Sequence, residues 1–503
     1  MAPRTNGTDR ISATLAANRL GVGAVVYFVL SAAAPLTVVA GVVTTGYAVT
    51  GIIGLPIAFL AVGAVIAVFA VGYVAMARHM ANAGAFYSYI AQGLGRPAGV
   101  GGAWVALTAY NALQVGLYGA FGAAAAPLLE QWLSLSLEWW LLGLIAWALV
   151  AALGLMRVDF NGTILAVLIT AEIVVILLFN LADLVNPAAG GVATTATVFS
   201  PGALFAPGVG ALLVIAVTGF VGFESSVVFS EESRDPRRTV PYATYISIAV
   251  IAGLYAFSSW AMTMAVGADR IVEFSQKNAT ETIFVLAADH LGATIVDIAR
   301  VLFATSVFAA AVSFHNTTSR YIFALGRERV LPAYFGKTSA RTGAPRSGSI
   351  AQSVLGFTVI VVFAVLGLDP VVDLFYKAGT LGGFGVLLLI TATSLSVLRY
   401  FARNPGGENV WRRLIAPGVA CVLLGVFSYL AVSNFTTLLG VPPDSALGWV
   451  LPGLYLVAAV GGLLWGLSLR GRNPEVYARI GLGAKAAAGD PATGPTPTAT
   501  AGR

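Results

Sequence analysis

The sequence predicts an all-α polytopic membrane protein with twelve transmembrane helices. Hydrophobic residues make up 58% of the 503 residues and charged residues only 10%, whereas soluble domains carry about 25% charged residues. The mean hydropathy is +0.86. Apolar stretches of about 20 residues, the length that crosses a bilayer as a helix, recur along the chain. Basic residues cluster in alternate connections between these stretches, as expected for a chain that crosses a membrane many times.

Twelve apolar stretches follow one another in chain order. They lie near residues 22–46, 52–77, 98–126, 139–157, 161–182, 207–231, 242–266, 298–325, 348–367, 372–397, 413–433 and 447–469. The polar tail before the first stretch has no small-residue cleavage site, so we interpret this stretch as a retained helix and not as a signal peptide. The tail from Gly481 to Arg503 is rich in Ala, Gly, Pro and Thr, which is typical of disorder.

The distribution of Lys and Arg predicts the orientation. If the amino terminus is cytoplasmic, 24 of the 28 basic residues fall on the inner side. The outer connections hold only Arg270 and Lys277, while Arg300 and Lys377 lie at the outer ends of two stretches. We therefore expect a multi-pass protein among the lipids of the plasma (inner) membrane, with both termini in the cytoplasm. The pI near 9.4 follows from this topology, and no nucleic acid partner is expected.

Groups that support enzymatic or metal chemistry are sparse. The single cysteine, Cys421, lies in an apolar stretch, and His79, His290 and His315 are far apart in the sequence. No carboxylate or thiol spacing around them suggests a set of metal ligands, and no GxxxxGK[ST] phosphate loop occurs. We therefore expect that the protein is not an enzyme and has no cofactor and no metal.

The sixth stretch contains an interruption, GFVGFE, at residues 219–224. Gly219 and Gly222 loosen a helix, and Glu224 places an ionisable group at a depth where insertion costs about 2.5 to 3.5 kcal/mol. Non-helical backbone persists at that depth only where it is buried in protein or lines a cavity. The pattern predicts a discontinuous helix at a binding site.

A second interruption, Ser31-Ala32-Ala33-Ala34-Pro35, lies in the first stretch. Pro35 has no amide to donate and its ring clashes with the carbonyl of residue 31, so the helix must kink or open there. A simple proline kink is the alternative interpretation. The first and sixth stretches occupy corresponding positions of two five-helix halves and cross in opposite directions, which indicates an inverted repeat. The predicted organisation is a tail at 1–20, repeats at 21–182 and 207–398, two further helices at 413–470 and a tail at 481–503.

Paired breaks of this kind suit a zwitterionic ligand. A half-helix that begins at a break offers unpaired amides to a carboxylate, and one that ends there offers carbonyls to an ammonium group or a cation. The predicted substrate-binding residues are Ser31, Ala32, Ala33, Ala34, Pro35, Tyr110, Asn111, Gly219, Phe220, Gly222, Phe223 and Glu224. The small residues permit close backbone approach. Phe220 and Phe223 are candidate aromatic gates, with core or lipid-facing packing as the alternative.

Glu224 has several open roles. An ionised carboxylate would favour a cationic substrate or bind a coupling ion, a protonated one would carry a proton, and a structural one would cap the second half-helix. Tyr110 and Asn111 share a helical face of the third stretch with Gln114 and Tyr118, either toward a cavity or toward a neighbouring helix.

Three segments resemble the amino acid, polyamine and organocation transporter superfamily. They are GFVGFESSVVFSEESRDPRRTVP at 219–241, NTTSRYIFALGRERVLP at 316–332 and, more weakly, AGAFYSY at 83–89. The resemblance covers about residues 15–470. It implies a LeuT-like five-plus-five inverted repeat with two extra helices, and transport of amino acids or related amines by alternating access.

The chain departs from this family pattern at two places. Ala32, Ala33 and Ala34 stand where the first break of the family usually has glycines. Some proton-dependent members carry a lysine in the fifth span near the vacated sodium position, whereas the fifth span of this chain has Glu172 and no lysine. Candidates for coupling to H+ or Na+ are therefore Glu224, Glu172, Thr305 and Ser306, and the two hydroxyls of the eighth stretch would otherwise bond back to their own helix.

The expected function is secondary active transport of an amino acid or related amine across the plasma membrane. A polyamine or organocation transporter of the same fold is one alternative, and a non-transporting nutrient sensor is another. A sensor usually carries a sizeable soluble signalling domain, and a membrane-embedded enzyme requires a reactive cluster. The sequence contains neither feature.

Overall fold

The computed structural model describes residues 20–80, 84–156, 158–339, 341–483 and 486. Most of the two predicted tails, at 1–19 and 487–503, lies outside the described residues. The described chain is helical, apart from turns and one isolated bridge between Leu20 and Ser233. This confirms the predicted all-α class.

The helices follow in chain order. The first part contains α1 (Val22–Ala33), α2 (Pro35–Thr37), η1 (Val38–Val43), α3 (Thr44–Thr50), α4 (Leu55–His79), α5 (Phe86–Gly93), α6 (Arg96–Leu133), α7 (Trp139–Gly154), α8 (Val158–Val185), α9 (Gly191–Val198) and α10 (Pro201–Leu204). The middle part contains α11 (Val209–Phe220), α12 (Ser225–Val228), η2 (Phe229–Glu232), α13 (Pro236–Val266), α14 (Ile271–Asn278), η3 (Ala279–Glu281), α15 (Thr282–Leu291) and α16 (Ala293–Arg327). The last part contains η4 (Ala333–Gly336), α17 (Arg346–Val365), η5 (Pro370–Tyr376), α18 (Lys377–Arg403), η6 (Trp411–Ile415), α19 (Ala416–Ser433), α20 (Phe435–Leu439), α21 (Leu447–Arg472) and α22 (Pro474–Arg479).

Eleven helical segments of the described chain are long and apolar enough to cross a membrane. The fourth predicted span corresponds to α7, which is apolar but has only 16 residues. At a rise of 1.5 Å per residue it extends about 24 Å, less than the roughly 30 Å of a typical hydrocarbon core. The structure thus confirms a polytopic membrane protein and contains eleven full-length spans with one shorter apolar helix.

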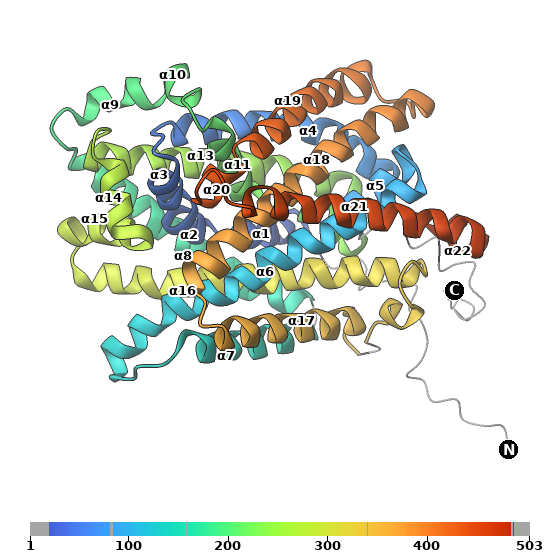
Figure 1. Ribbon diagram of the computed structural model, residues 1–503, viewed down its shortest axis with the longest axis horizontal. Helices are drawn as coiled ribbons and strands as arrows, with labels where there is room; N and C mark the ends of the chain where they lie inside the picture. Colours follow the sequence, from blue (N-terminus) through green and yellow to red (C-terminus); the bar gives the residue numbers. More distant parts are fainter. Residues whose placement is uncertain (1–19, 81–83, 157, 340, 484–485, 487–503) are drawn as a thin grey trace, which may run out of the picture.

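The long helices lie side by side along the long axis of the molecule (Figure 1). Helices α6 and α16 extend over most of its length, and α1 and α11 lie inside the bundle. Short helices α9, α14 and α15 gather at one end, and α5 and α22 gather at the other. The bundle therefore has two distinct ends, with the interrupted helices between them.

The first interruption falls at Ala34. Helix α1 ends at Ala33, Ala34 adopts a left-handed conformation with φ of 44°, and Pro35 begins α2. Proline is favoured at the first position of a helix because its missing amide would be unpaired there in any case. The chain continues as one π-helical segment, Val38–Val43, before α3. The predicted break in the first span is therefore confirmed, and it is more than a kink because one residue leaves the helical region.

The second interruption falls between Phe220 and Ser225. Helix α11 ends at Phe220, and Gly222 has φ of 116°, which side chains other than glycine rarely adopt. Helix α12 covers only Ser225–Val228 and passes into the 3-10 turn Phe229–Glu232. The predicted break in the sixth span is also confirmed.

Candidate functional site

The two interruptions meet inside the bundle. A Cβ placed on Gly222 would lie 2.5 Å from the Ala32 Cβ and 3.0 Å from the Ala33 amide nitrogen, so only glycine allows this approach. The Tyr255 hydroxyl of α13 donates to the Ala33 carbonyl at 2.9 Å, and the Ser31 hydroxyl donates to the Ala309 carbonyl of α16 at 3.1 Å. The ends of the broken helices are therefore fixed against each other and against two neighbouring spans.

A small cavity lies beside this junction, and we name it the central cavity. It has a volume of about 70 Å³. Its walls come from both breaks and from α6, α16 and α18, and are formed by Ala32, Ala33, Ala34, Thr37, Val38, Val42, Leu113, Leu117, Ile215, Thr218, Val221, Ala310, Phe314, Phe375, Tyr376, Gly379 and Thr380. None of these lining side chains is a carboxylate, ammonium or guanidinium group. The cavity therefore combines apolar walls with the backbone of two interrupted helices.

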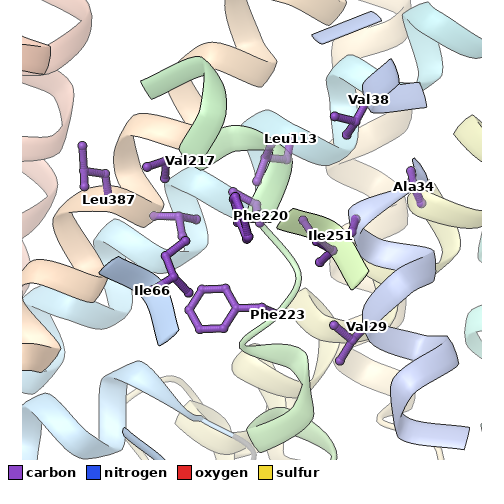
Figure 2. Packing of buried hydrophobic residues seen from close by; sticks show 14 of the residues in the cluster. Val29, Ala34, Val38, Ile66, Leu113, Val217, Phe220, Phe223, Ile251 and Leu387 are labelled. Atoms are coloured by element: carbon purple, nitrogen blue, oxygen red, sulfur yellow. The ribbon is translucent and has the colours of Figure 1, made fainter. Parts of the chain in front are cut away.

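The predicted gate residues Phe220 and Phe223 lie outside the lining of this cavity. The Phe220 ring lies 6.5 Å from that of Phe59, and the Phe223 ring lies 6.0 Å from that of Phe69. In Figure 2, Phe223 points from the non-helical segment toward Ile66 of α4. Both rings are completely or almost completely buried, so their contacts in this conformation are those of core packing, the alternative considered above.

Some of the other predicted residues line the central cavity, and others pack around it. Ala32, Ala33 and Ala34 line the cavity, whereas Pro35 is buried at the start of α2. A Cβ on Gly219 would lie 3.0 Å from the Phe59 ring, so this glycine permits close packing of α11 on α4. The Asn111 side chain donates to the Leu107 carbonyl of its own helix at 2.7 Å and does not line the cavity.

Glu224 stabilises the second break. Its Oε2 accepts a hydrogen bond from the Gly222 amide at 2.9 Å, and its Oε1 accepts one from the Tyr110 hydroxyl at 2.7 Å. The side chain is completely buried and makes no cap on the amides of α12. The Tyr110 ring lies 5.4 Å from the ring of Tyr321 in α16. The carboxylate thus joins α6 to the broken helix, and both of its oxygens are occupied.

Glu172 of α8 faces the first break. Its Oε2 accepts from the Leu36 amide at 3.4 Å, and the Ser306 hydroxyl lies close to the same carboxyl. The other oxygen, Oε1, is buried with no hydrogen-bond partner among the described residues. Ser306 also accepts from the Thr37 amide at 3.3 Å, whereas the Thr305 hydroxyl bonds back to its own helix at Leu302. Of the predicted coupling residues, Glu172 and Ser306 therefore lie together at the first break, whereas Glu224 is bonded at the second.

Phe375 separates the central cavity from a larger one toward the α14 and α15 end. This outer cavity has a volume of about 460 Å³, and Phe375 is the residue that lines both cavities. The edge of the Phe375 ring would lie 3.1 Å from a Cβ placed on Gly41, so the ring packs directly against the π-helical segment. Arg300 and Glu281 border the outer cavity and form an ion pair at 2.8 Å.

Two buried ion pairs close the opposite end of the sixth span. Arg320 of α16 binds Glu232 at 2.8 and 2.9 Å, and Arg327 binds Glu231 through two contacts of 2.9 Å. The Leu20 amide donates to the Glu232 carbonyl at 3.1 Å, which joins the start of α1 to the same turn. In each pair the guanidinium donates two hydrogen bonds to one carboxylate, so the pair fixes the relative orientation of the two side chains as well as their distance.

Comparison with known proteins identifies the family. The family model described as amino acid permease matches residues 20–462 of the chain. The chain belongs to the amino acid permease family. This permease is 21% identical to the low-affinity putrescine importer PlaP of Escherichia coli K12 over 409 residues, which covers 78% of this chain and 82% of PlaP. It is 26% identical to the histidine permease HisP of Lactococcus lactis over 241 residues, 46% of this chain and 50% of HisP. It is 28% identical to human cationic amino acid transporter 4 over 193 residues, 37% of this chain and 27% of that protein.

Several lining residues of this permease were not predicted from its sequence. Leu113, Phe314 and Phe375 come from three different spans. Phe375 lies in the π-helical start of the tenth span, and no local pattern distinguishes it from other phenylalanines. The glycine-rich sequence that follows it, at 379–383, contributes Gly379 and Thr380 to the lining.

Proposed function

We propose that this permease is a secondary active transporter that moves an amino acid with a neutral, apolar side chain across the plasma membrane by alternating access. The observation that carries the proposal is the uncharged central cavity beside the junction of the two broken helices. Helix ends supply backbone amides and carbonyls to the charged ends of a zwitterion. The lining side chains offer an apolar surface to the rest of the substrate.

The absence of charged lining residues favours a neutral amino acid over a polyamine. A second ammonium group in this cavity would lose its hydration without meeting a carboxylate, and an unpaired buried charge is strongly unfavourable. Glu224 does not provide that partner, because both its oxygens are bonded to Tyr110 and Gly222. Because one relative is named a putrescine importer, this polyamine is included as a comparison substrate in the test below.

Alternating access requires a barrier on each side of the site. A cavity of about 70 Å³ holds only a few water molecules, so an amino acid needs a more open state. Phe375 would move aside to open the central cavity to the outer one. On the other side, Arg320 and Arg327 would release Glu232 and Glu231. We assign the observed conformation to a state of the transport cycle in which both sides of the site are closed.

Glu172 is our candidate for the coupling group. Its buried Oε1 has no hydrogen-bond partner among the described residues, which is unfavourable for an ionised carboxylate and is relieved when the carboxyl binds a proton. Sodium would require several oxygen ligands, and the described neighbours of the carboxyl supply mainly the Ser306 hydroxyl. We therefore propose coupling to protons at Glu172.

Uptake into proteoliposomes tests both proposals. Purified protein is reconstituted and the uptake of radiolabelled leucine, alanine, lysine and putrescine is measured under a proton or a sodium gradient. We expect uptake of a neutral amino acid driven by the proton gradient, and loss of that driving force in Glu172→Gln with exchange of substrate retained. Uptake of lysine or putrescine alone would contradict the substrate proposal, and undiminished proton-driven uptake by Glu172→Gln would contradict the coupling proposal.

A further inference from the structure

The segment after the last span folds back onto the bundle. This segment, Pro474–Gly483, consists of α22 and four residues that follow it, and we name it the C-terminal strap. The side chain of Asn473, the residue before the strap, caps α22 by accepting a hydrogen bond from the Val476 amide at 3.2 Å. Ile480 is completely buried, although it lies beyond every predicted span. In Figure 1, α22 lies at the same end of the bundle as α5.

A single carboxylate holds the end of the strap. Glu328 directly follows α16, and its Oε2 and Oε1 accept hydrogen bonds from the amides of Gly481 at 2.6 Å and Gly483 at 2.7 Å. Both glycines have positive φ, 79° and 60°, which turns their amides toward one acceptor. The Tyr87 hydroxyl of α5 donates to the same carboxylate. Three hydrogen bonds therefore converge on this one buried side chain.

Helices α5 and α6 hold the rest of the strap. The Gln92 side chain donates to the Gly481 carbonyl at 3.1 Å, and the Arg96 guanidinium donates to the Ala478 carbonyl at 3.1 Å. Arg96 also lies 5.2 Å above the centre of the Tyr477 ring. The strap therefore connects the end of α21 to α5, to the start of α6 and to the end of α16.

The attachment point is next to one of the ion pairs that close the sixth span. Arg327, the residue before Glu328, has a completely buried side chain and binds Glu231. A displacement of the Arg327 backbone away from Glu231 would also displace Glu328, whose side chain is held by the strap and by Tyr87. The strap is therefore attached one residue away from the ion pair.

We propose that the C-terminal strap is a clamp that stabilises the closed state of the α5 end of the bundle by holding Arg327 against Glu231. This inference rests on the alternating-access cycle proposed above. Release of the strap would lower the barrier to opening at that end and expose the turn around Ser230.

Thiol labelling tests the clamp without any substrate. Replacing the single cysteine by Cys421→Ala gives a background in which Ser230→Cys, a buried position beside Glu231, is the only thiol. Inside-out vesicles are treated with a membrane-impermeant maleimide, and the labelling rate is measured. We expect truncation after Asn473 to raise the rate on the order of tenfold, because the two hydrogen bonds from the strap amides to Glu328 are lost. The matched control is truncation after Ala486, which leaves the strap intact and should label at the unmodified rate.

A point variant covers the case in which the shorter chain does not fold. Gly481→Ala places a side chain at φ of 79° and brings its Cβ to 2.9 Å from the Ala91 Cβ, so it loosens the strap while keeping the chain length. Faster labelling of folded Gly481→Ala protein supports the clamp. Equal rates in Gly481→Ala, the control truncation and the parent chain overturn it. The labelling assay uses no substrate, so a failure to detect uptake in the transport test does not affect its result. If uptake is detected but labelling is unchanged, the clamp is refuted and the proposed transport function is not.

Discussion

The contact between the two breaks makes Gly222→Ala the most informative single change. The new methyl group would lie 2.5 Å from the Ala32 Cβ, well inside van der Waals contact, and Gly222 has φ of 116°. The positive φ costs an alanine about 1 to 3 kcal/mol. Overpacking of a buried site typically adds about 1 to 3 kcal/mol. The variant should therefore lose about 2 to 6 kcal/mol of stability unless the breaks separate.

The assay compares thermal unfolding in detergent with uptake into proteoliposomes. Gly253→Ala is the matched control, because Gly253 lies within α13 and a Cβ there has nothing within 4 Å. Alanine is also favoured over glycine in a helix by up to about 1 kcal/mol, so the control should unfold at or above the parent temperature. Gly222→Ala should unfold at a lower temperature and lose most uptake. If the two variants unfold together and transport equally, the breaks are not in contact in the functional protein.

Three further changes test individual contacts. Glu224→Gln keeps an acceptor for Gly222 or Tyr110 but replaces the other acceptor oxygen by an amide donor, so we expect lower stability in a thermal melt and an unchanged pH profile of uptake; a shifted profile would assign proton transfer to this residue. Phe375→Ala joins the two cavities, so we expect faster exchange of bound radiolabelled substrate at the outer face, and an unaltered exchange rate would contradict its role as a barrier. At Glu328, burial raises the pKa of the carboxyl above its ordinary value, although hydrogen bonds from Tyr87 and the strap amides lower it. The folded state then binds this proton more tightly than the unfolded state, so acidification from pH 8 to pH 5 should stabilise the parent protein relative to Glu328→Gln. Melting temperatures at both pH values measure this, and a difference with the opposite sign would disprove it.

The sequence was sufficient to predict the positions of both breaks, because their causes are local. Pro35 cannot continue α1, and Gly222 supplies a backbone conformation that other residues avoid. The polytopic helical class could also be predicted, because it follows from the composition of each apolar stretch. The length of α7 was overestimated by a hydropathy pattern, since Leu155 and Met156 are apolar but form a turn after the helix. The inverted relation of the two halves stays a prediction.

The orientation of side chains around the site could not be predicted, because it depends on packing between distant spans. Phe220 and Phe223 lie at the break, yet their rings fit against Phe59 and Phe69 of α4. The aromatic rings that line the cavity are those of Phe314, Phe375 and Tyr376, which are more than 90 residues away in the sequence. Neighbours in sequence determine where a helix ends, whereas neighbours in space determine which residues line the cavity.

The first break has a consequence for affinity. Its first free amides already have acceptors, since Leu36 donates to Glu172 and Thr37 donates to Ser306. An incoming carboxylate would therefore exchange with internal acceptors instead of filling unpaired donors, and the net gain is the difference between two sets of hydrogen bonds. In the proposed transport cycle, such a competition would stabilise the empty protein and make substrate binding weak and readily reversed. Reversible binding would suit a transporter of the proposed kind, which releases its substrate on every cycle.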